Sequence, residues 1–291
     1  LKRPSAQIHA AICIAAITGT SKTTIFSELP FRDHTVPMLQ AFGANVENRG
    51  TRMEEADSLP SAVGTMTTIS PSETPWLSGV PTEGGKPKGM TFLPGDISSA
   101  AFIIVAAIIT PKSSVTINNV LLNPTRTEYL NVLREMGADL HFVAEGFSLG
   151  EPHGTITANY SPNLRGVTTE KEVATLIIDE IPILSIAAAF AKGMSLFQGI
   201  GDLRTKESDR IEAICSNLSQ FGVNSSSTSN SLSIQGKKPE EMTKPRLLHT
   251  HKDHRIAMAF IVAGIALPFP ITIDRPEDIG QSFPGFEALL C

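Results

Sequence analysis

An internal repeat constrains the fold of this 291-residue chain more than any other feature. Three amphipathic helices with similar endings are predicted, and each ends at a glycine, Gly43, Gly137 or Gly222. Glycine suits the left-handed position that follows the last helical residue. The glycines recur at intervals of roughly 90 residues, about twice the period of common solenoid repeats. The spacing therefore predicts a compact pseudo-symmetric domain and not an open solenoid.

Each copy of the repeat also contains an apolar helix followed by a strand. Helices that are apolar nearly all round are predicted at 8–18, 99–109, 181–192 and 255–266. Strand candidates rich in β-branched and apolar residues follow at 23–26, 114–118, 195–198 and 271–274. A helix without a polar face belongs inside a domain. We therefore predict an α/β fold in which sheets and amphipathic helices wrap buried helices.

The segment 48–90 lacks this periodicity and is rich in Ser, Thr, Pro and Gly. That composition predicts mostly loops and short hairpins. Within it, residues 83–89 have the Gly- and Lys-rich composition of a connector. We therefore predict a domain boundary near residue 92, with a smaller, incomplete first domain at 1–91 and a second domain at 92–291.

Composition argues against several classes of protein. A net charge of -5 and a pI of about 5.8 differ from the basic character of nucleic-acid-binding proteins. The longest apolar runs are shorter than the roughly 20 residues of a membrane-spanning helix, so we expect no membrane partner either. Cys13, Cys215 and Cys291 are far apart and lack metal-ligand spacing, which favours a reduced cytoplasmic compartment. Because the chain starts with Leu1, we expect a fragment of a longer protein.

The run of residues 204–210, Arg-Thr-Lys-Glu-Ser-Asp-Arg, opens an amphipathic stretch and contains three cations and two carboxylates. A helix that begins near Ser208 would add backbone N–H groups and the positive end of its dipole to Lys206 and Arg210. This indicates a site for a phosphate or a carboxylate. The alternative, given equal weight from the run alone, is a capped helix start whose charges face water.

Polar residues stand at the start of every buried helix. They are Ser5, Ala6 and Gln7; Asp96, Ser98 and Ser99; Asp179 and Glu180; and Asp253, His254 and Arg255. Helix capping explains Asp96, Ser98 and Ser99, whereas Gln7 and the His254–Arg255 pair are poor caps. Asp179 is by default a cap, and its competing role is a general base on a substrate hydroxyl.

Cations recur in the loops of the repeat as well. Arg32 and Arg126 occupy, in the first and second copies, the loop position that residues 204–210 occupy in the third. Several helix N-termini and cationic loops at one cleft would suit an anion. The pattern therefore predicts a ligand with more than one acidic group.

In this order and spacing, the motifs resemble the 3-phosphoshikimate 1-carboxyvinyltransferase (5-enolpyruvylshikimate-3-phosphate synthase) family. The matching segments are 4–7 (PSAQ), 32–35 (RDHT), 94–100 (PGDISSA), 179–182 (DEIP), 204–210 (RTKESDR), 253–259 (DHRIAMA) and 282–286 (SFPGF). The resemblance implies a two-domain inside-out α/β barrel built from βαβαββ repeats, with the first domain incomplete here. It implies transfer of the enolpyruvyl group of phosphoenolpyruvate to the 5-hydroxyl of shikimate 3-phosphate, with release of phosphate, in chorismate and aromatic amino acid biosynthesis. It implies no metal or organic cofactor, and we expect a monomer.

The resemblance also assigns roles to individual residues. Ser5, Ala6, Gln7 and Arg32 are similar to contacts of shikimate 3-phosphate, and Gln7 also approaches phosphoenolpyruvate. Lys206 is similar to a contact shared by both substrates, Asp179 to the base on the 5-hydroxyl, and Glu207 to a proton-transfer group at the phosphoenolpyruvate methylene. Arg210 and Arg255 are similar to phosphoenolpyruvate anchors, with His254 close by. Fixed cations of this kind neutralise a trianionic cosubstrate.

Departures from the family limit these expectations. The family's early Lys-Ser and Arg motif and its Gly-Asn-Ala-Gly-Thr segment are absent, so half of the phosphoenolpyruvate site would be missing. We therefore expect this chain alone to be inactive as a transferase, and robust phosphate release from the two substrates would contradict this. Two alternatives stay open: the sister transferase acting on UDP-N-acetylglucosamine, which the run 204–210 disfavours, and a non-catalytic binding module or truncated relic.

Overall fold

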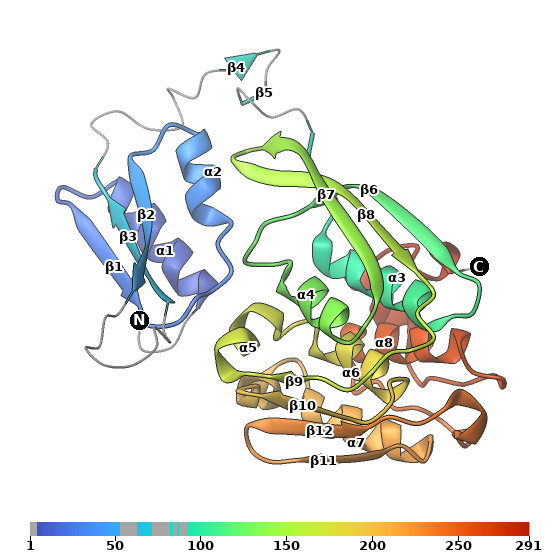
Figure 1. Ribbon diagram of the computed structural model, residues 1–291. Coiled ribbons are helices and arrows are strands. Elements are labelled where there is room, and N and C mark those ends of the chain that lie inside the picture. The colour runs from blue at the N-terminus through green and yellow to red at the C-terminus, as the bar shows by residue number, and fades with distance from the viewer. Residues whose placement is uncertain (1–4, 53–62, 72–81, 84–85, 88–91, 291) are drawn as a thin grey trace. The chain divides into compact units, whose positions relative to one another are not determined.

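The computed structural model describes residues 5–52, 63–71, 82–83, 86–87 and 92–290 (Figure 1). Their contacts divide the chain into two compact units. Unit 1 comprises residues 1–94, 121–127 and 144–154, and unit 2 comprises residues 95–120, 128–143 and 155–291. The predicted domains at 1–91 and 92–291 stay a prediction.

Unit 1 contains two helices and a three-stranded antiparallel sheet of order β1-β3-β2. Its elements are α1 (Ala6–Ile17), β1 (Thr23–Ser27), α2 (Thr35–Ala41), β2 (Val46–Arg52) and β3 (Val63–Ile69), and two short strands, β4 (Thr82–Glu83) and β5 (Lys86–Pro87), pair with each other. Both helices and all three strands of the larger sheet contribute to one apolar core, which includes Cys13, Ile25, Leu39 and Ile69. The helix and strand predicted at 8–18 and 23–26 are confirmed within two residues.

The prediction of loops and short hairpins at 48–90 agrees with the antiparallel pairs β2–β3 and β4–β5, but it did not place β3 at the centre of a sheet. Residues 48–52 lie in β2, and residues 63–69 form β3, the central strand of the sheet. Thr67 and Ile69 are buried while Thr68 between them is half-buried, which is the two-residue period of a strand. Threonine is β-branched and suits strands, so a high Ser and Thr content concealed this pattern. Most of the remaining segment lies outside the described residues.

Unit 2 contains most of the helices and strands of the second part of the chain, and the hairpin end of β7 and β8 groups with unit 1. The helices are α3 (Ile97–Ile109), α4 (Glu128–Glu135), α5 (Lys171–Ile177), α6 (Ile181–Ala189), α7 (Arg210–Gln220) and α8 (His254–Ile265). The strands are β6 (Ser114–Leu121), β7 (Asp139–Ser148), β8 (Glu151–Asn159), β9 (Thr168–Thr169), β10 (Met194–Gln198), β11 (Asn224–Ser227) and β12 (Ser231–Gln235). Short 3-10 helices are η1 (Gly201–Thr205), η2 (Pro239–Glu241), η3 (Pro276–Gln281) and η4 (Glu287–Leu289).

Three apolar helices form the centre of unit 2. α3, α6 and α8 contact one another, and Figure 1 shows them grouped behind the strands of this unit. Every residue of α6 is buried, as are most residues of α3 and α8. The helices predicted at 99–109, 181–192 and 255–266 are therefore confirmed, although α6 ends at Ala189. Among the described residues, no helix is long and apolar enough to cross a membrane.

Two sheets of unit 2 follow the same plan. In each, the strand after a buried helix has a parallel neighbour on one side and an antiparallel strand on the other. In the first sheet, Gly95 forms a parallel bridge to β6, and β8 and then β7 follow on the other side of β6. In the second, β9 is the parallel neighbour of β10, and β12 and then β11 follow on its other side. The strand predicted at 271–274 was wrong. Of it, the structure shows a single parallel bridge between Ile273 and Leu248, so a short β-rich sequence without an extended pairing partner does not form a strand here.

The three glycines that defined the repeat have the predicted backbone conformation. Gly43, Gly137 and Gly222 have φ values of 85°, 92° and 68° and directly follow the last turns of α2, α4 and α7. A side chain at these positions would be strained, because L-residues rarely adopt this region. The repeat read from the sequence is thus a repeat of helix endings.

The described thiols are not paired. Cys13 is buried in the core of unit 1, Cys215 is half-buried in α7, and both are free. Burial, reinforced by the charge of Asp33, raises the pKa of the Cys13 thiol to about 11. This side chain therefore acts as a small apolar residue of the core.

Gly236 allows the chain after β12 to pass close to the end of α6. A Cβ atom at this position would lie 1.8 Å from the carbonyl oxygen of Ala191. Because the obstacle is backbone, we expect Gly236→Ala to lower the free energy of unfolding by about 2 kcal/mol or more, measured by urea denaturation. Gly280→Ala is the control, since a Cβ there meets no atom within 4 Å. Equal unfolding midpoints for the two variants would contradict this packing.

Candidate active site

The N-terminal ends of the three buried helices of unit 2 are joined by side chains. Ser98, in the first turn of α3, donates its hydroxyl hydrogen to the carboxylate of Glu180, which precedes α6. Arg255, in the first turn of α8, places Nη1 3.9 Å from the same carboxylate and donates to the carbonyl oxygen of Asp179 at 3.0 Å. The partial positive charges of three helix ends therefore gather at one place in unit 2.

Arg210 lies at the centre of a buried ion-pair network beside these helix ends. Its side chain is 1% exposed, and its Nε lies 2.7 Å from Asp253 Oδ2. Its Nη2 lies 2.6 Å from Glu207 Oε2, and its Nη1 lies 3.4 Å from Asp179 Oδ1. The ammonium group of Lys206 is 3.5 Å from the same Asp179 oxygen. A buried guanidinium requires such partners, and it thereby fixes the positions of three carboxylates.

The loop before α7 places Lys206, Glu207 and Arg210 in this network. The helix start expected near Ser208 is confirmed within two residues: η1 and an extended Lys206 come first, and α7 begins at Arg210. Asp209 is the N-cap, because its side chain accepts a hydrogen bond from the amide of Glu212 at 3.0 Å. Ser208 is not the cap, since its hydroxyl donates to Asp253 at 3.1 Å.

Arg204 has a different environment from the other cations of this run. Its Nη1 lies 2.8 Å from Asp209, and its Nη2 donates to the carbonyl oxygen of Thr228 at 2.6 Å. These contacts tie the start of α7 to the loop between β11 and β12. Arg204 therefore supports the loop that carries the site.

A strained turn precedes α8 and positions Asp253. His251 and Lys252 have φ values of 55° and 63°, so two consecutive residues other than glycine are left-handed. This conformation costs roughly 1–2 kcal/mol per residue. Asp253 then caps α8 by accepting from the amide of Arg255 at 2.9 Å and also reaches Arg210. One carboxylate thus joins the α8 terminus to the network.

Two pKa values at the start of α8 are shifted downward. Burial alone would raise the pKa of Asp253, but the hydrogen bonds and charge of Arg210, with hydrogen bonds from Arg255 and Ser208, lower it overall. The pKa of His254 is lowered by burial, then by the positive charge of Arg255. At neutral pH the site therefore holds an ionised Asp253 and an uncharged His254.

The members of the network differ in access to solvent. The side chains of Glu207, Lys206 and Arg255 are 51%, 31% and 17% exposed, whereas those of Arg210 and Asp253 are 1% and 0% exposed. A ligand that approaches from solvent therefore meets two cations and one carboxylate first. Within the part of the chain that is described, no group of His, Cys, Asp and Glu side chains is arranged to hold a metal ion.

The predicted site residues of unit 1 lie at and after the start of α1. Ser5 is the N-cap of α1, and its hydroxyl oxygen accepts from the amide of Ile8 at 3.3 Å. Ala6 is the first helical residue, Gln7 is exposed, and Arg32 is half-buried in the loop between β1 and α2. Their predicted contacts with the ligand of the unit 2 site stay predictions.

Sequence reasoning named the residues of the unit 2 cluster but missed what some of them do. Asp96 is the cap of α3, as expected, and Ser99 hydrogen-bonds to it. Ser98 was wrongly read as a further cap, and Asp253 as no more than a cap. Asp179 does not cap α6 either, because Glu180 occupies that position and makes no side-chain cap bond. The signal that was available was a second acidic residue, Glu180, directly before an apolar helix.

Comparisons with known proteins agree on one family. The chain matches the family described as EPSP synthase (3-phosphoshikimate 1-carboxyvinyltransferase) over residues 1–290. It is 37% identical over 300 residues to the 3-phosphoshikimate 1-carboxyvinyltransferase of Mesorhizobium japonicum, covering 98% of this chain and 60% of that protein. It is 38% identical over 291 residues to that of Phenylobacterium zucineum, covering 100% of this chain and 59% of that protein. The chain thus spans about 60% of the length of these relatives.

Solved structures support the predicted fold. An EPSP synthase from Acinetobacter baumannii matches with a TM-score of 0.80 and 35% identity, covering 98% of this chain and 60% of that one. The enolpyruvyl transferase NikO from Streptomyces tendae matches with a TM-score of 0.61 at 17% identity, covering 94% and 56%, and so bears on the fold alone. The prediction of an enolpyruvyl transferase fold is confirmed.

The lowered pKa of Asp253 predicts how stability depends on pH. Because the folded pKa lies below the ordinary value of 3.8, ionised Asp253 stabilises the fold fully above that value, and the contribution is lost as the pH falls through the folded pKa. Asp253→Asn leaves the buried Arg210 without its fully buried carboxylate partner, so we expect a loss of about 3 kcal/mol or more at pH 7. The difference from wild type should shrink in urea titrations at acidic pH.

Asp202→Asn provides the control for this titration, because Asp202 is exposed at the start of η1. Its effect on the free energy of unfolding should stay within about 0.5 kcal/mol at all pH values. An Asp253→Asn variant as stable as wild type at pH 7 would be incompatible with a buried pair to Arg210.

Proposed function

Because the chain belongs to the EPSP synthase (3-phosphoshikimate 1-carboxyvinyltransferase) family, we propose that the cluster around Arg210 is part of an active site for enolpyruvyl transfer. The reaction joins phosphoenolpyruvate to the 5-hydroxyl of shikimate 3-phosphate and releases phosphate. The observation that carries this proposal is the meeting of Asp179 and Glu207 with Lys206 and Arg210 within 3.5 Å, in the pairs already given. Acid–base groups and anion-binding groups thus share one site.

The cations suit the charge of the cosubstrate. Phosphoenolpyruvate carries a phosphate and a carboxylate, and both are anionic. Lys206 and Arg255 are the partly exposed cations of the cluster, and charge-assisted hydrogen bonds from them would hold these groups. The N-termini of α3, α6 and α8 add a favourable potential of about 0.3–1 kcal/mol each.

The two carboxylates suit the two proton transfers. Attack of the 5-hydroxyl oxygen on the enol carbon needs a base, and we assign this role to Asp179, whose Oδ1 lies 3.5 Å from Lys206 and 3.4 Å from Arg210. The methylene carbon must gain a proton, and we assign this transfer to Glu207, the exposed carboxylate of the network. Loss of phosphate and of a proton from the resulting methyl group then restores the double bond, and fixed cations stabilise the leaving phosphate.

Arg210 can anchor an anion only if its ion pair with Glu207 opens. Its Nη2 is held by Glu207 at 2.6 Å, and the guanidinium is 1% exposed. An anion that binds Arg210 must therefore displace Glu207. In this proposal the displacement couples two events, because the anion gains a cation and Glu207 becomes available for proton transfer.

The remaining assignments are part of the same proposal. Ser5, Ala6, Gln7 and Arg32 would contact shikimate 3-phosphate, and His254 would lie near phosphoenolpyruvate. A monomeric state and a cytoplasmic location are expected from the family. The alternative of a transferase for UDP-N-acetylglucosamine is not favoured, because the relatives matched above bear the name of the shikimate enzyme.

Binding of phosphoenolpyruvate tests the proposal directly. Calorimetry in the presence of shikimate 3-phosphate measures binding and does not require turnover. It therefore suits a chain that spans about 60% of the length of its relatives. We expect saturable binding, weakened about tenfold or more in Arg255→Gln, since a hydrogen bond to a charged group is lost. Lys244→Gln, which removes an exposed cation elsewhere in unit 2, should bind like wild type. Absence of binding, or equal loss in both variants, would refute the assignment, and absence would favour the non-catalytic relic.

Glu207→Gln should have the opposite effect on binding. The substitution removes the charge that holds Arg210, so a competing carboxylate no longer has to be displaced. We expect phosphoenolpyruvate to bind severalfold more tightly, whereas any phosphate release catalysed by the chain should fall by at least about tenfold for want of the proton-transfer group. Weaker binding in Glu207→Gln would argue that Glu207 does not compete with the anion.

A further inference from the structure

A cationic cavity lies within unit 2 at the opposite ends of the buried helices. It has a volume of about 600 Å³ and is lined by Ile109, the last residue of α3, and by Phe190, which follows α6. The helix α3 is 13 residues long, or about 20 Å at 1.5 Å per residue. The cavity is therefore about one helix length from the cluster around Arg210 and shares no lining residue with it.

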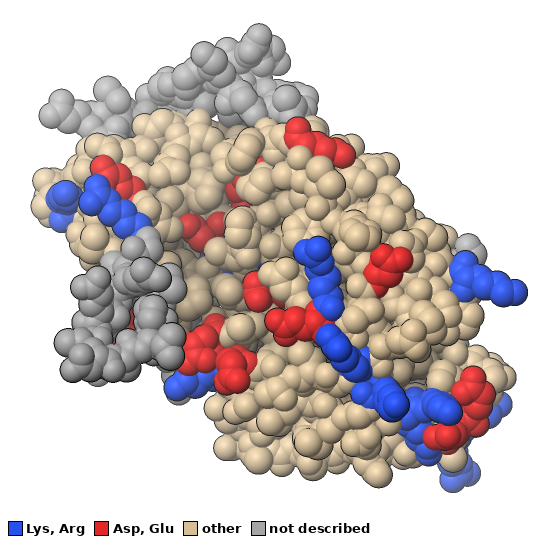
Figure 2. All heavy atoms as spheres, viewed as in Figure 1, with Lys and Arg blue, Asp and Glu red and all other residues tan. Residues whose placement is uncertain are grey.

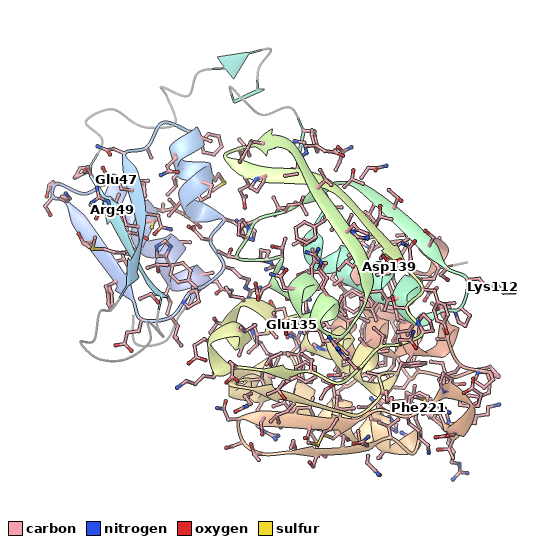
Figure 3. The ribbon with its side chains drawn as sticks, in the orientation of Figure 1. Glu47, Arg49, Lys112, Glu135, Asp139 and Phe221 are labelled. Carbon is pink, nitrogen blue, oxygen red and sulfur yellow. The ribbon has the colours of Figure 1, made fainter. Side chains whose placement is uncertain are left out.

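Four cations line this cavity. They are Arg165, Lys192, Lys237 and Lys238. Among the residues that the structure describes, none of the four forms an ion pair, although Glu241 lines the same cavity. Figure 2 shows Lys and Arg side chains in a row, with Asp and Glu side chains beside it, on the face of the molecule drawn there. Figure 3 labels Glu135, whose carbonyl oxygen accepts from Arg165 Nε at 3.2 Å.

Two of these cations are held side by side by the backbone. Arg165 and Lys192 face each other across a parallel β-bridge, and neighbouring strands lie about 4.8 Å apart. Like charges directly opposite one another are destabilising. The arrangement is fixed by hydrogen bonds of the chain on both sides, from Lys192 N to Leu164 O at 2.7 Å and from Gly166 N to Lys192 O at 2.9 Å. A bound anion would relieve the repulsion.

Helix ends account for these cations only in part. Cations near a helix C-terminus often serve its unpaired carbonyl groups. Arg165 does so at Glu135, the last residue of α4, and the ammonium group of Lys237 donates to Gly222 O at 3.2 Å, just after α7 and next to Phe221, which Figure 3 labels. At the ends of α3 and α6, which border the cavity, backbone amides serve instead: Ile108 O accepts from Ser161 N at 2.8 Å, and Ala189 O accepts from Lys237 N at 2.9 Å. Each guanidinium or ammonium group has several N–H donors, so one such bond leaves others for a ligand.

The lining also contains apolar and aromatic groups between the cations. Tyr160, Leu164 and Phe190 are examples. The volume lies in the range of small-molecule sites, roughly 300–1,000 Å³. Cations suit phosphate, and flat apolar side chains suit a planar organic body. We propose that this cavity binds a phosphorylated organic molecule with a flat apolar body, the chemistry of a nucleotide, at a site remote from the Arg210 cluster. This does not rest on the function proposed above.

Calorimetry with ATP in a chelating, magnesium-free buffer tests the proposal. We expect saturable binding that is at least about tenfold tighter than that of either inorganic pyrophosphate or adenosine, since both parts of the molecule contribute. The affinity should fall as the salt concentration rises. Pyrophosphate that binds as tightly as ATP would overturn the organic part of the proposal, and absence of saturable binding would overturn all of it.

Variants locate the binding site. Arg165→Gln combined with Lys192→Gln should weaken ATP binding about tenfold or more, and the single substitution Lys238→Gln, which removes one cation, should weaken it less. Lys244→Gln and Lys206→Gln should leave it unchanged, because the first lies outside both sites and the second belongs to the Arg210 cluster. An ATP affinity that survives the double substitution, or that is lost in Lys206→Gln, would overturn the assignment to this cavity. Urea midpoints equal to wild type confirm that the variants are folded.

Discussion

The buried guanidinium of Arg210 is the interaction on which the rest of the candidate site depends. It contacts carboxylates from three separate parts of the sequence, Asp179, Glu207 and Asp253. A charge removed from water must be paired, so the loop before α7, the start of α8 and the residues before α6 cannot move independently. The left-handed turn before α8 directly precedes Asp253, and the hydrogen bonds and charge of Arg210 lower the pKa of Asp253.

The buried helices α3, α6 and α8 separate the polar groups of unit 2 into two sets, one at each helix end. α3, α6 and α8 have almost no polar residues in their middle turns, so their polar groups can lie only at the two ends. At the N-terminal end, Ser98, Glu180 and Arg255 connect the helices and place positive helix dipoles near the site. At the C-terminal end, backbone amides donate to the last carbonyl groups of α3 and α6, and cations line a separate cavity. Two chemically different surfaces thus arise from one core.

The sequence determined the repeat and named the residues of the candidate site. Glycine after each amphipathic helix, apolar helices without a polar face and motifs such as 204–210 are local signals, and each reflects the physics of a few neighbouring residues. For this reason the buried helices were predicted within a few residues. The strand β3 was missed, because a Thr-rich strand is recognised by its position between two others and not by composition.

Only the tertiary structure decided which polar residue does what. Ser98, Asp179 and Asp253 all stand where helix caps stand, and by sequence alone capping explains each of them. In the fold, Ser98 donates to Glu180, whereas Asp179 and Asp253 pair with Arg210. Folding brings these partners, which are more than 30 residues apart in the sequence, within hydrogen-bond distance. The same is true of the cationic cavity, whose members are ordinary surface lysines and an arginine in the sequence. Helix starts and ends depend on neighbouring residues and can be predicted from the sequence, whereas burial and charge pairing depend on chain segments that only folding brings together.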